Sequence, residues 1–204
     1  MPRRARRPAR RRQRRQLLQV FTEGEATEPE YFDAVKRLQS AFVLRVDSRH
    51  GEPWDLVHWA DEFKRSEDRR WRQEGLSPEG RTEVWCVFDR DEHRYVDRAI
   101  ELAERSGVRV AFSHACFEFW LLLHYQDFGA PTDGNGQVVC QQLRRHLGTG
   151  KHVNLGDLAG RYATARERAI GRNGQHDRDD VTQPTKRDPS TNVYELVELL
   201  GVTY

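Results

Sequence analysis

The sequence lacks any run of about 18 apolar residues, the length that a membrane-spanning helix needs. Its basic start is followed by further charge instead of an apolar segment, so we expect no signal peptide. Only 37% of its 204 residues are hydrophobic, but these occur in blocks, which indicates a packed core. We therefore expect one domain over residues 16–204, with no membrane partner.

Cysteine is scarce. Cys86, Cys116 and Cys140 are odd in number and have no C-x-x-C spacing. This pattern argues against both a disulfide framework and a zinc site. We interpret the three as reduced core residues of a cytoplasmic protein.

Acidic residues are absent from residues 3–15, which contain nine arginines. Without these nine charges the formal net charge of +2 would become −7, so a basic tail precedes an acidic body. We expect residues 1–15 to be disordered. The tail arginines, including Arg11, Arg12, Arg14 and Arg15, are candidate phosphate contacts, because arginines that meet phosphates release counterions. The alternative is a solvated extension without a partner.

An apolar run at residues 84–88 ends abruptly in Asp89, Arg90, Asp91 and Glu92. Such a run is typical of a central parallel strand, and ligands collect at the carboxyl ends of these strands. Asp89 and Asp91 point the same way in an extended chain. Their oxygens suit Mg²⁺ or Mn²⁺. The alternative is an acidic loop that caps the next helix.

Apolar blocks alternate between strand and helix periodicity along the chain. The strands are expected at 17–21, 42–46, 84–88 and 108–112, and the first three helices at 28–39, 53–73 and 95–106. This order predicts an α/β fold with a central parallel sheet of about four strands and helices on both faces. Further helices are expected at 117–125, 138–147, 156–172 and 189–200, the last with Asp188 as its N-cap. The four strand ends carry Glu23, Asp47, Asp89 with Asp91, and His114 toward one edge, which favours the metal site.

The turn after the first strand contains Glu23 and Gly24. Glycine permits a tight turn or a close approach to a ligand. Glu23 is therefore our candidate for chemistry, whereas Glu25 and Glu28 are explained by the dipole of the helix that follows.

Glu118 stands within the apolar block 117–125, where a buried acid without a partner is costly. A site role and a structural ion pair both remain open. His93 and His124 are weaker, supporting candidates. Lys151, Arg161 and Arg168 are candidate phosphate contacts, with ordinary solvated charges as the alternative.

Four blocks carry a family resemblance: residues 21–32, 84–93, 117–124 and 188–193. In these blocks the chain resembles the RloB-like family of the Toprim superfamily. The resemblance implies a Toprim-like (Rossmann-like) fold in which Glu23 is a general acid/base or metal ligand. Asp89 and Asp91 would be the metal pair. The sequence departs from the family at His114-Ala115, where relatives usually have Asn-Pro.

The resemblance also implies a nuclease associated with restriction-modification and phage defence. We expect one or two Mg²⁺ or Mn²⁺ ions on Glu23, Asp89 and Asp91 to support cleavage of DNA or of RNA such as tRNA. Glu23 or Glu118 would move the proton. By analogy, a partner ATPase or another defence component is possible, as is an oligomer. The alternative is a non-catalytic Toprim-like nucleic-acid-binding or regulatory subunit. Nucleotidyl transfer, a third hypothesis, is disfavoured because no companion nucleotide-binding domain is evident.

Overall fold

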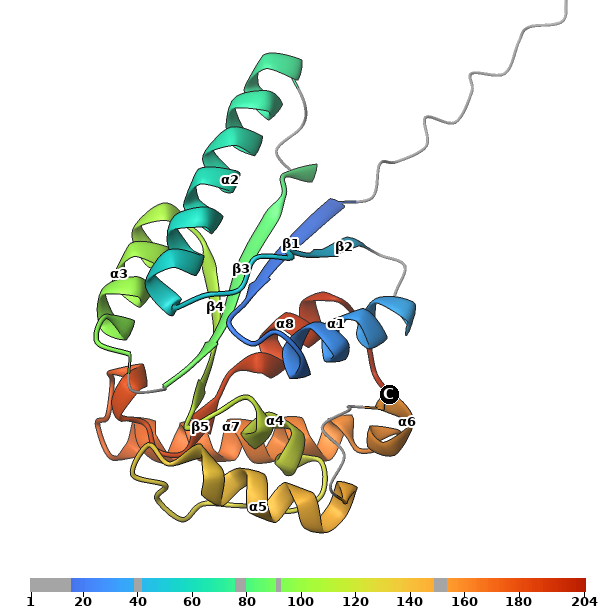
Figure 1. Cartoon of the computed structure of the whole chain (residues 1–204), viewed down its shortest axis with the longest axis vertical. Helices are drawn as coiled ribbons and strands as arrows, with labels where there is room; N and C mark the ends of the chain where they lie inside the picture. Colours follow the sequence, from blue (N-terminus) through green and yellow to red (C-terminus); the bar gives the residue numbers. More distant parts are fainter. Residues whose placement is uncertain (1–15, 39–41, 76–79, 91–92, 149–153) are drawn as a thin grey trace, which may run out of the picture.

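The computed structural model describes residues 16–38, 42–75, 80–90, 93–148 and 154–204 (Figure 1). The strands are β1 Gln16–Thr22, β2 Phe42–Val46, β3 Glu83–Asp89, β4 Arg109–His114 and β5 Ser190–Thr191. The helices are α1 Thr27–Leu38, α2 Pro53–Glu74, α3 Val96–Ser106, α4 Glu118–Leu123, α5 Gly136–Leu147, α6 Leu155–Leu158, α7 Tyr162–Arg178 and α8 Val193–Leu199, with a 3-10 turn at Pro184–Lys186. Within these ranges no helix combines the length and apolar character needed to cross a membrane.

The five strands form one sheet in the order β2-β1-β3-β4-β5. The first four strands are parallel, as the alternating pattern predicts, and β5 is antiparallel to β4. The α/β class is thus confirmed. The sheet has five strands, one more than the four expected from the sequence. β1 and β3 have neighbours on both sides, which explains why their residues are almost all buried.

Helices cover both faces of the sheet. Successive residues of a strand point to opposite faces. Val84, Cys86 and Phe88 accordingly pack with α2 and α3, while Trp85 and Val87 pack with residues of α1, α4 and α8. Figure 1 shows α2 and α3 on one side of the sheet and α1 and α8 on the other, with α4, α5 and α7 beyond the carboxyl ends of the strands.

The segment before α8 differs from the prediction. Asp188 does not cap a helix: its carboxylate accepts hydrogen bonds from the backbone N–H groups of Thr132 and Asp133, at 2.8 and 2.7 Å. Ser190 and Thr191 then form β5, and α8 begins only at Val193. The N-cap prediction is therefore wrong, because distant backbone groups claim the carboxylate.

Beside β5, the Asn192 side chain continues the edge of the sheet. Its Oδ1 accepts from the Phe112 N–H at 2.7 Å, and its Nδ2 donates to the Val110 carbonyl at 3.0 Å. One amide side chain thus satisfies backbone groups of β4 beyond the two-residue strand β5.

The helix expected at 156–172 is divided into α6 and α7. Gly160 adopts a positive φ of 74°, a conformation that favours glycine and separates the two helices. α7 extends to Arg178, beyond residue 172 where the expected helix ended. The His176 ring lies 3.0 Å from the Pro189 carbonyl, and Asp177 forms an ion pair with Arg187 at 2.6 Å. These contacts stabilise the polar last turn of α7.

Candidate functional site

The carboxyl ends of β1 and β3 bring Glu23 and Asp89 together. Thr22 is in register with Val87, and the Glu23 N–H donates to the Val87 carbonyl at 3.0 Å. The Glu23 side chain then turns toward β3, where its Oε2 accepts from the Asp89 N–H at 2.9 Å. Asp91 lies outside the described residues.

Asp89 has a buried carboxylate that its surroundings only partly satisfy. Oδ2 accepts from the Phe117 N–H at 2.9 Å. Oδ1 is also buried, and it has no hydrogen-bond partner among the described residues. Burial raises the pKa of Asp89 well above its usual range, and the nearby charges of Glu28, Glu23 and Glu118 raise it further. The ionised form is therefore only partly compensated by the described residues.

Glu28 also belongs to this acidic site, although we had attributed it to the helix dipole. It lies in the first turn of α1, yet it is only 6% exposed. Its Oε1 accepts from the Gly24 N–H at 3.1 Å. Burial raises the pKa of Glu28, and Glu118 and Glu23 contribute to the same direction. The sequence does not mark this contact, because an acid in the first turn of a helix is ordinarily explained by the helix dipole.

Gly24 allows this close approach of the Glu28 side chain. A Cβ at position 24 would lie 2.8 Å from the Glu28 carboxyl carbon, closer than such atoms pack. The turn therefore needs glycine for space.

Replacing Glu28 with glutamine is expected to stabilise the protein by about 1 kcal/mol at neutral pH in chelator. The amide removes a buried charge and keeps an oxygen for the Gly24 N–H. Because the folded-state pKa of Glu28 is raised, its ionisation costs stability as the pH rises, and the gain should shrink near pH 4. Urea unfolding at several pH values measures this. The exposed Glu25→Gln in the same turn is the matched control; an equal effect in both variants would contradict the assignment.

Glu118 is the first residue of α4, and its Oε1 accepts from the Thr27 hydroxyl at 3.4 Å. Within the described ranges Glu118 has no ion-pair partner, so the structural ion pair considered from the sequence is not present there. Glu118 also raises the pKa values of Asp89 and Glu28. It is therefore the fourth carboxylate of a cluster, with Glu23, Glu28 and Asp89, that we call the acidic corner.

His93 contacts the acidic corner through Glu23. Its Nε2 lies 2.6 Å from Glu23 Oε1, and its Nδ1 lies 3.9 Å from a carboxylate oxygen of Glu52. The His93 ring thus stands in direct hydrogen-bond contact with Glu23.

His124 lies instead in the aromatic core. Its Nδ1 is 2.9 Å from the Trp120 carbonyl, and its Nε2 is 3.0 Å from the Tyr204 hydroxyl. Burial lowers the pKa of His124 to about 4, so the ring is neutral at physiological pH. These contacts give His124 a packing role.

Two other strand ends use their polar side chains locally. Asp47 pairs with Arg49 at 2.9 Å, and His114 Nδ1 lies 3.3 Å from Asp188 Oδ1. They do not join the contacts of the acidic corner described above.

The candidate arginines of α7 have structural partners. Arg161 lies over the Tyr125 ring, 4.9 Å from its centroid, and Arg168 donates to the Leu123 carbonyl at 2.6 Å. Arg166 and Arg172 pair with Glu198 and Asp127. Much of this basic side is thus engaged within the protein. The remaining phosphate-contact candidates, Lys151 and Arg11, Arg12, Arg14 and Arg15, lie outside the described residues.

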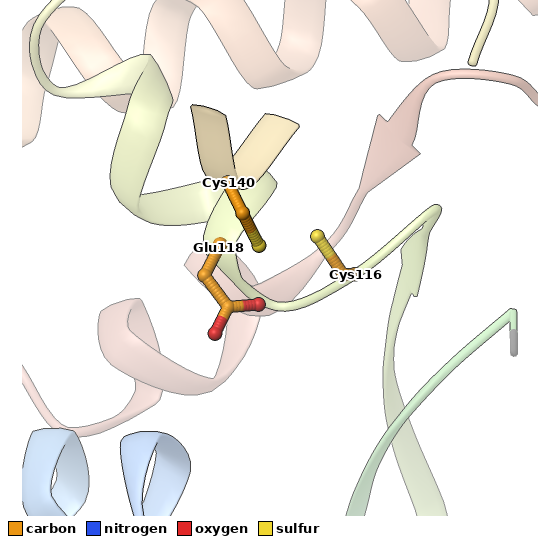
Figure 2. A group of neighbouring side chains, drawn as sticks. All are labelled: Cys116, Glu118 and Cys140. Atoms are coloured by element: carbon orange, nitrogen blue, oxygen red, sulfur yellow. The ribbon is translucent and has the colours of Figure 1, made fainter. Parts of the chain in front are cut away.

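The cysteines differ from the expectation of three core residues. Cys86 is buried in β3, but Cys116 and Cys140 are only half-buried. They lie beside Glu118, and one ligand atom from each of the three residues lies within 4.8 Å of the other two (Figure 2). Among the described residues, these three form the one group of potential metal ligands whose ligand atoms all lie within this distance of one another. The carboxylates of the acidic corner do not form such a group.

A comparison with protein-family models gives a match for this chain. The family model described as RloB-like protein matches residues 18–200. No curated protein and no solved structure matches the chain. The matched span covers β1 through α8 and includes Glu23, Glu28, Asp89 and Glu118. The chain therefore belongs to the RloB-like family.

Proposed function

We propose that the protein is a divalent-metal-dependent nuclease of the Toprim type. The observation that carries this proposal is the buried Asp89 Oδ1, which has no partner among the described residues and faces a field made negative by Glu23, Glu28 and Glu118. A hard divalent cation satisfies such an oxygen and removes the repulsion between the carboxylates. The donor set, all carboxylate oxygen, fits Mg²⁺ or Mn²⁺.

Glu23 and Asp89 would hold the ion, with Asp91 as the further ligand implied by the family resemblance. When bound, Mg²⁺ or Mn²⁺ would reduce the charge on the phosphate oxygens and make a coordinated water more acidic.

The chain's own side chains orient the ligands and move the proton. The Phe117 N–H holds one Asp89 oxygen, and the Asp89 N–H holds Glu23. His93, at 2.6 Å from Glu23, can take up or return a proton through that carboxylate. Glu118, which is bound only by the Thr27 hydroxyl among the described residues, is the second candidate for proton transfer.

Nucleic acid would be attracted by basic residues, because the acidic corner itself repels phosphates. The arginine-rich residues 3–15 supply nine positive charges. A groove beside the carboxyl ends of β1 and β2 is lined in part by Lys36 and Arg45, with Asp33 and Asp47 in the same lining, and by His50, whose Nδ1 lies 3.4 Å from the Thr22 hydroxyl. A role in phage defence and a partner ATPase belong to the same proposal and follow from the family resemblance alone, whereas the proposed cytoplasmic location follows from the interpretation of the cysteines as reduced.

One observation favours the alternative, a non-catalytic nucleic-acid-binding or regulatory subunit. Glu23 already accepts from both His93 and the Asp89 N–H. Hydrogen bonds of this kind stabilise the acidic corner without any metal.

The two functions are distinguished by incubating the purified full chain with plasmid DNA and with total RNA, with Mg²⁺, Mn²⁺ or chelator. A nuclease produces cleavage products that require the metal and that follow the protein through its final purification step. Salt-dependent binding to both substrates with no cleavage under any metal would overturn the proposal in favour of the alternative.

A further inference from the structure

Cys116, Glu118 and Cys140 come from three places that the fold brings together. Cys116 lies in the turn between β4 and α4, Glu118 begins α4, and Cys140 is on α5. Figure 2 shows both sulfurs and the Glu118 carboxylate on neighbouring segments beside one another. One ligand atom from each residue lies within 4.8 Å of the other two.

Local packing leaves space around the Cys116 sulfur. Cys116 Sγ lies 3.7 Å from the Gly136 carbonyl, at the first residue of α5. A Cβ at position 136 would lie 3.2 Å from that sulfur, so a larger residue would crowd the thiol. Glycine at the start of α5 thus allows Cys116 and Cys140 to approach each other.

The two thiols are electronically unequal. Hydrogen bonding to Cys140 and burial raise the pKa of Cys116 well above its ordinary value, and Glu118 and Asp89 add to the rise. The hydrogen bond from Cys116 lowers the pKa of Cys140. A thiolate is the form that binds a soft cation.

We propose that Cys116, Cys140 and Glu118 form a second metal site, specific for a thiophilic divalent cation such as Zn²⁺. Zinc takes thiolate at about 2.3 Å and carboxylate at about 2.0–2.2 Å, which puts neighbouring tetrahedral ligands roughly 3.3–3.8 Å apart. The three ligand atoms already lie within 4.8 Å of one another, so only small side-chain movements are required to reach these distances. Three protein ligands leave a fourth position for water. Mg²⁺ and Mn²⁺ prefer oxygen donors, so the two sulfurs exclude them.

Glu118 links this site to the acidic corner. Its negative charge contributes to the raised pKa of Asp89, and its Oε1 accepts from Thr27 on α1. A cation held between Glu118 and the two sulfurs would neutralise part of that charge and fix the carboxylate on the α5 side. A cation bound at Cys116, Cys140 and Glu118 would then reduce the negative charge that acts on Asp89. The existence of the site does not depend on the proposed nuclease activity.

Cobalt reports directly on this site, because Co²⁺ takes the place of Zn²⁺ and shows a thiolate-to-metal charge-transfer band. The reduced full chain, freed of metal with chelator, is titrated with Co²⁺ and then with Zn²⁺. We expect one equivalent of Co²⁺ to give the band and Zn²⁺ to abolish it by displacement. Cys116→Ser and Cys140→Ser should each remove the band, and Glu118→Gln should weaken binding at least about tenfold.

Cys86→Ala and Asp89→Asn are the controls, because they remove the third thiol and a carboxylate of the acidic corner that is not a proposed ligand, while leaving the three ligands in place. Both should retain the band, and circular dichroism establishes that each variant is folded. A band of unchanged strength in Cys116→Ser and Cys140→Ser would overturn the proposal. So would a reduced wild-type protein that gives no band and whose two thiols instead form a disulfide on mild oxidation.

Discussion

Asp89→Asn is expected to abolish nucleic-acid cleavage while the fold and nucleic-acid binding are retained. The asparagine has nearly the same shape, and its carbonyl oxygen can still accept from the Phe117 N–H. It removes the negative charge that would hold the cation. A metal ion contributes several kcal/mol to stabilisation of the transition state, and a loss of about 4 kcal/mol corresponds to roughly a 1,000-fold lower rate.

The measurement is the initial rate of cleavage with Mn²⁺, together with binding of the same substrate in chelator. Binding should be equal or tighter, because the variant repels phosphate less. Asp68→Asn is the matched control: it makes the same chemical change on α2, where Asp68 pairs with Lys64 at 3.7 Å. Cleavage by Asp89→Asn at the wild-type rate would show that the assignment of the catalytic site is wrong.

The second large effect concerns stability without metal. In chelator near pH 7.5, Asp89→Asn should be more stable than the wild type by about 1–3 kcal/mol, because it removes a buried charge whose oxygen Oδ1 lacks a partner in the described chain. The folded-state pKa of Asp89 is raised above its unfolded value near 3.8. Its favourable contribution is therefore complete below that pH and is lost as the pH rises through the folded-state pKa. The advantage of the variant should disappear toward pH 4.

Mn²⁺ should reverse this difference at neutral pH. A ligand at 100 times its dissociation constant stabilises the folded state by about 2.7 kcal/mol. The wild type should gain this stability, and Asp89→Asn should gain much less. Thermal and urea unfolding at several pH values, with chelator or Mn²⁺, measure both effects. Parallel curves for the two proteins under all conditions would contradict the metal site.

The parallel strands and the helices between them could be predicted because their sequence signals are local. The apolar run at residues 84–88 and the helix that follows it define a parallel strand, and the ends of such strands fall on one edge. That reasoning expected Glu23 and Asp89 at one edge of the sheet, and the fold places them on neighbouring strands in hydrogen-bond contact. β5 could not be predicted, since two residues carry no periodicity.

The remaining parts of the site depend on tertiary contacts. An acid in the first turn of a helix normally indicates a dipole interaction, and only packing shows that the side chain of Glu28 is buried. Similarly, Cys116 and Cys140 meet because α4 packs on α5, which their spacing does not indicate. The arginines of α7 look like a phosphate-binding side in the sequence, yet their partners lie on other elements.

The Asn192 amide has a consequence for self-association. Outer strands with open N–H and C=O groups are templates for strand addition by another molecule. Here the Phe112 N–H and the Val110 carbonyl of β4 are already occupied by Asn192, and β5 pairs with the residues that follow. Recruitment of a foreign strand along β4 would first require the segment from β5 to α8 to detach. This margin of the sheet is thereby protected against amyloid-like or domain-swapped assembly.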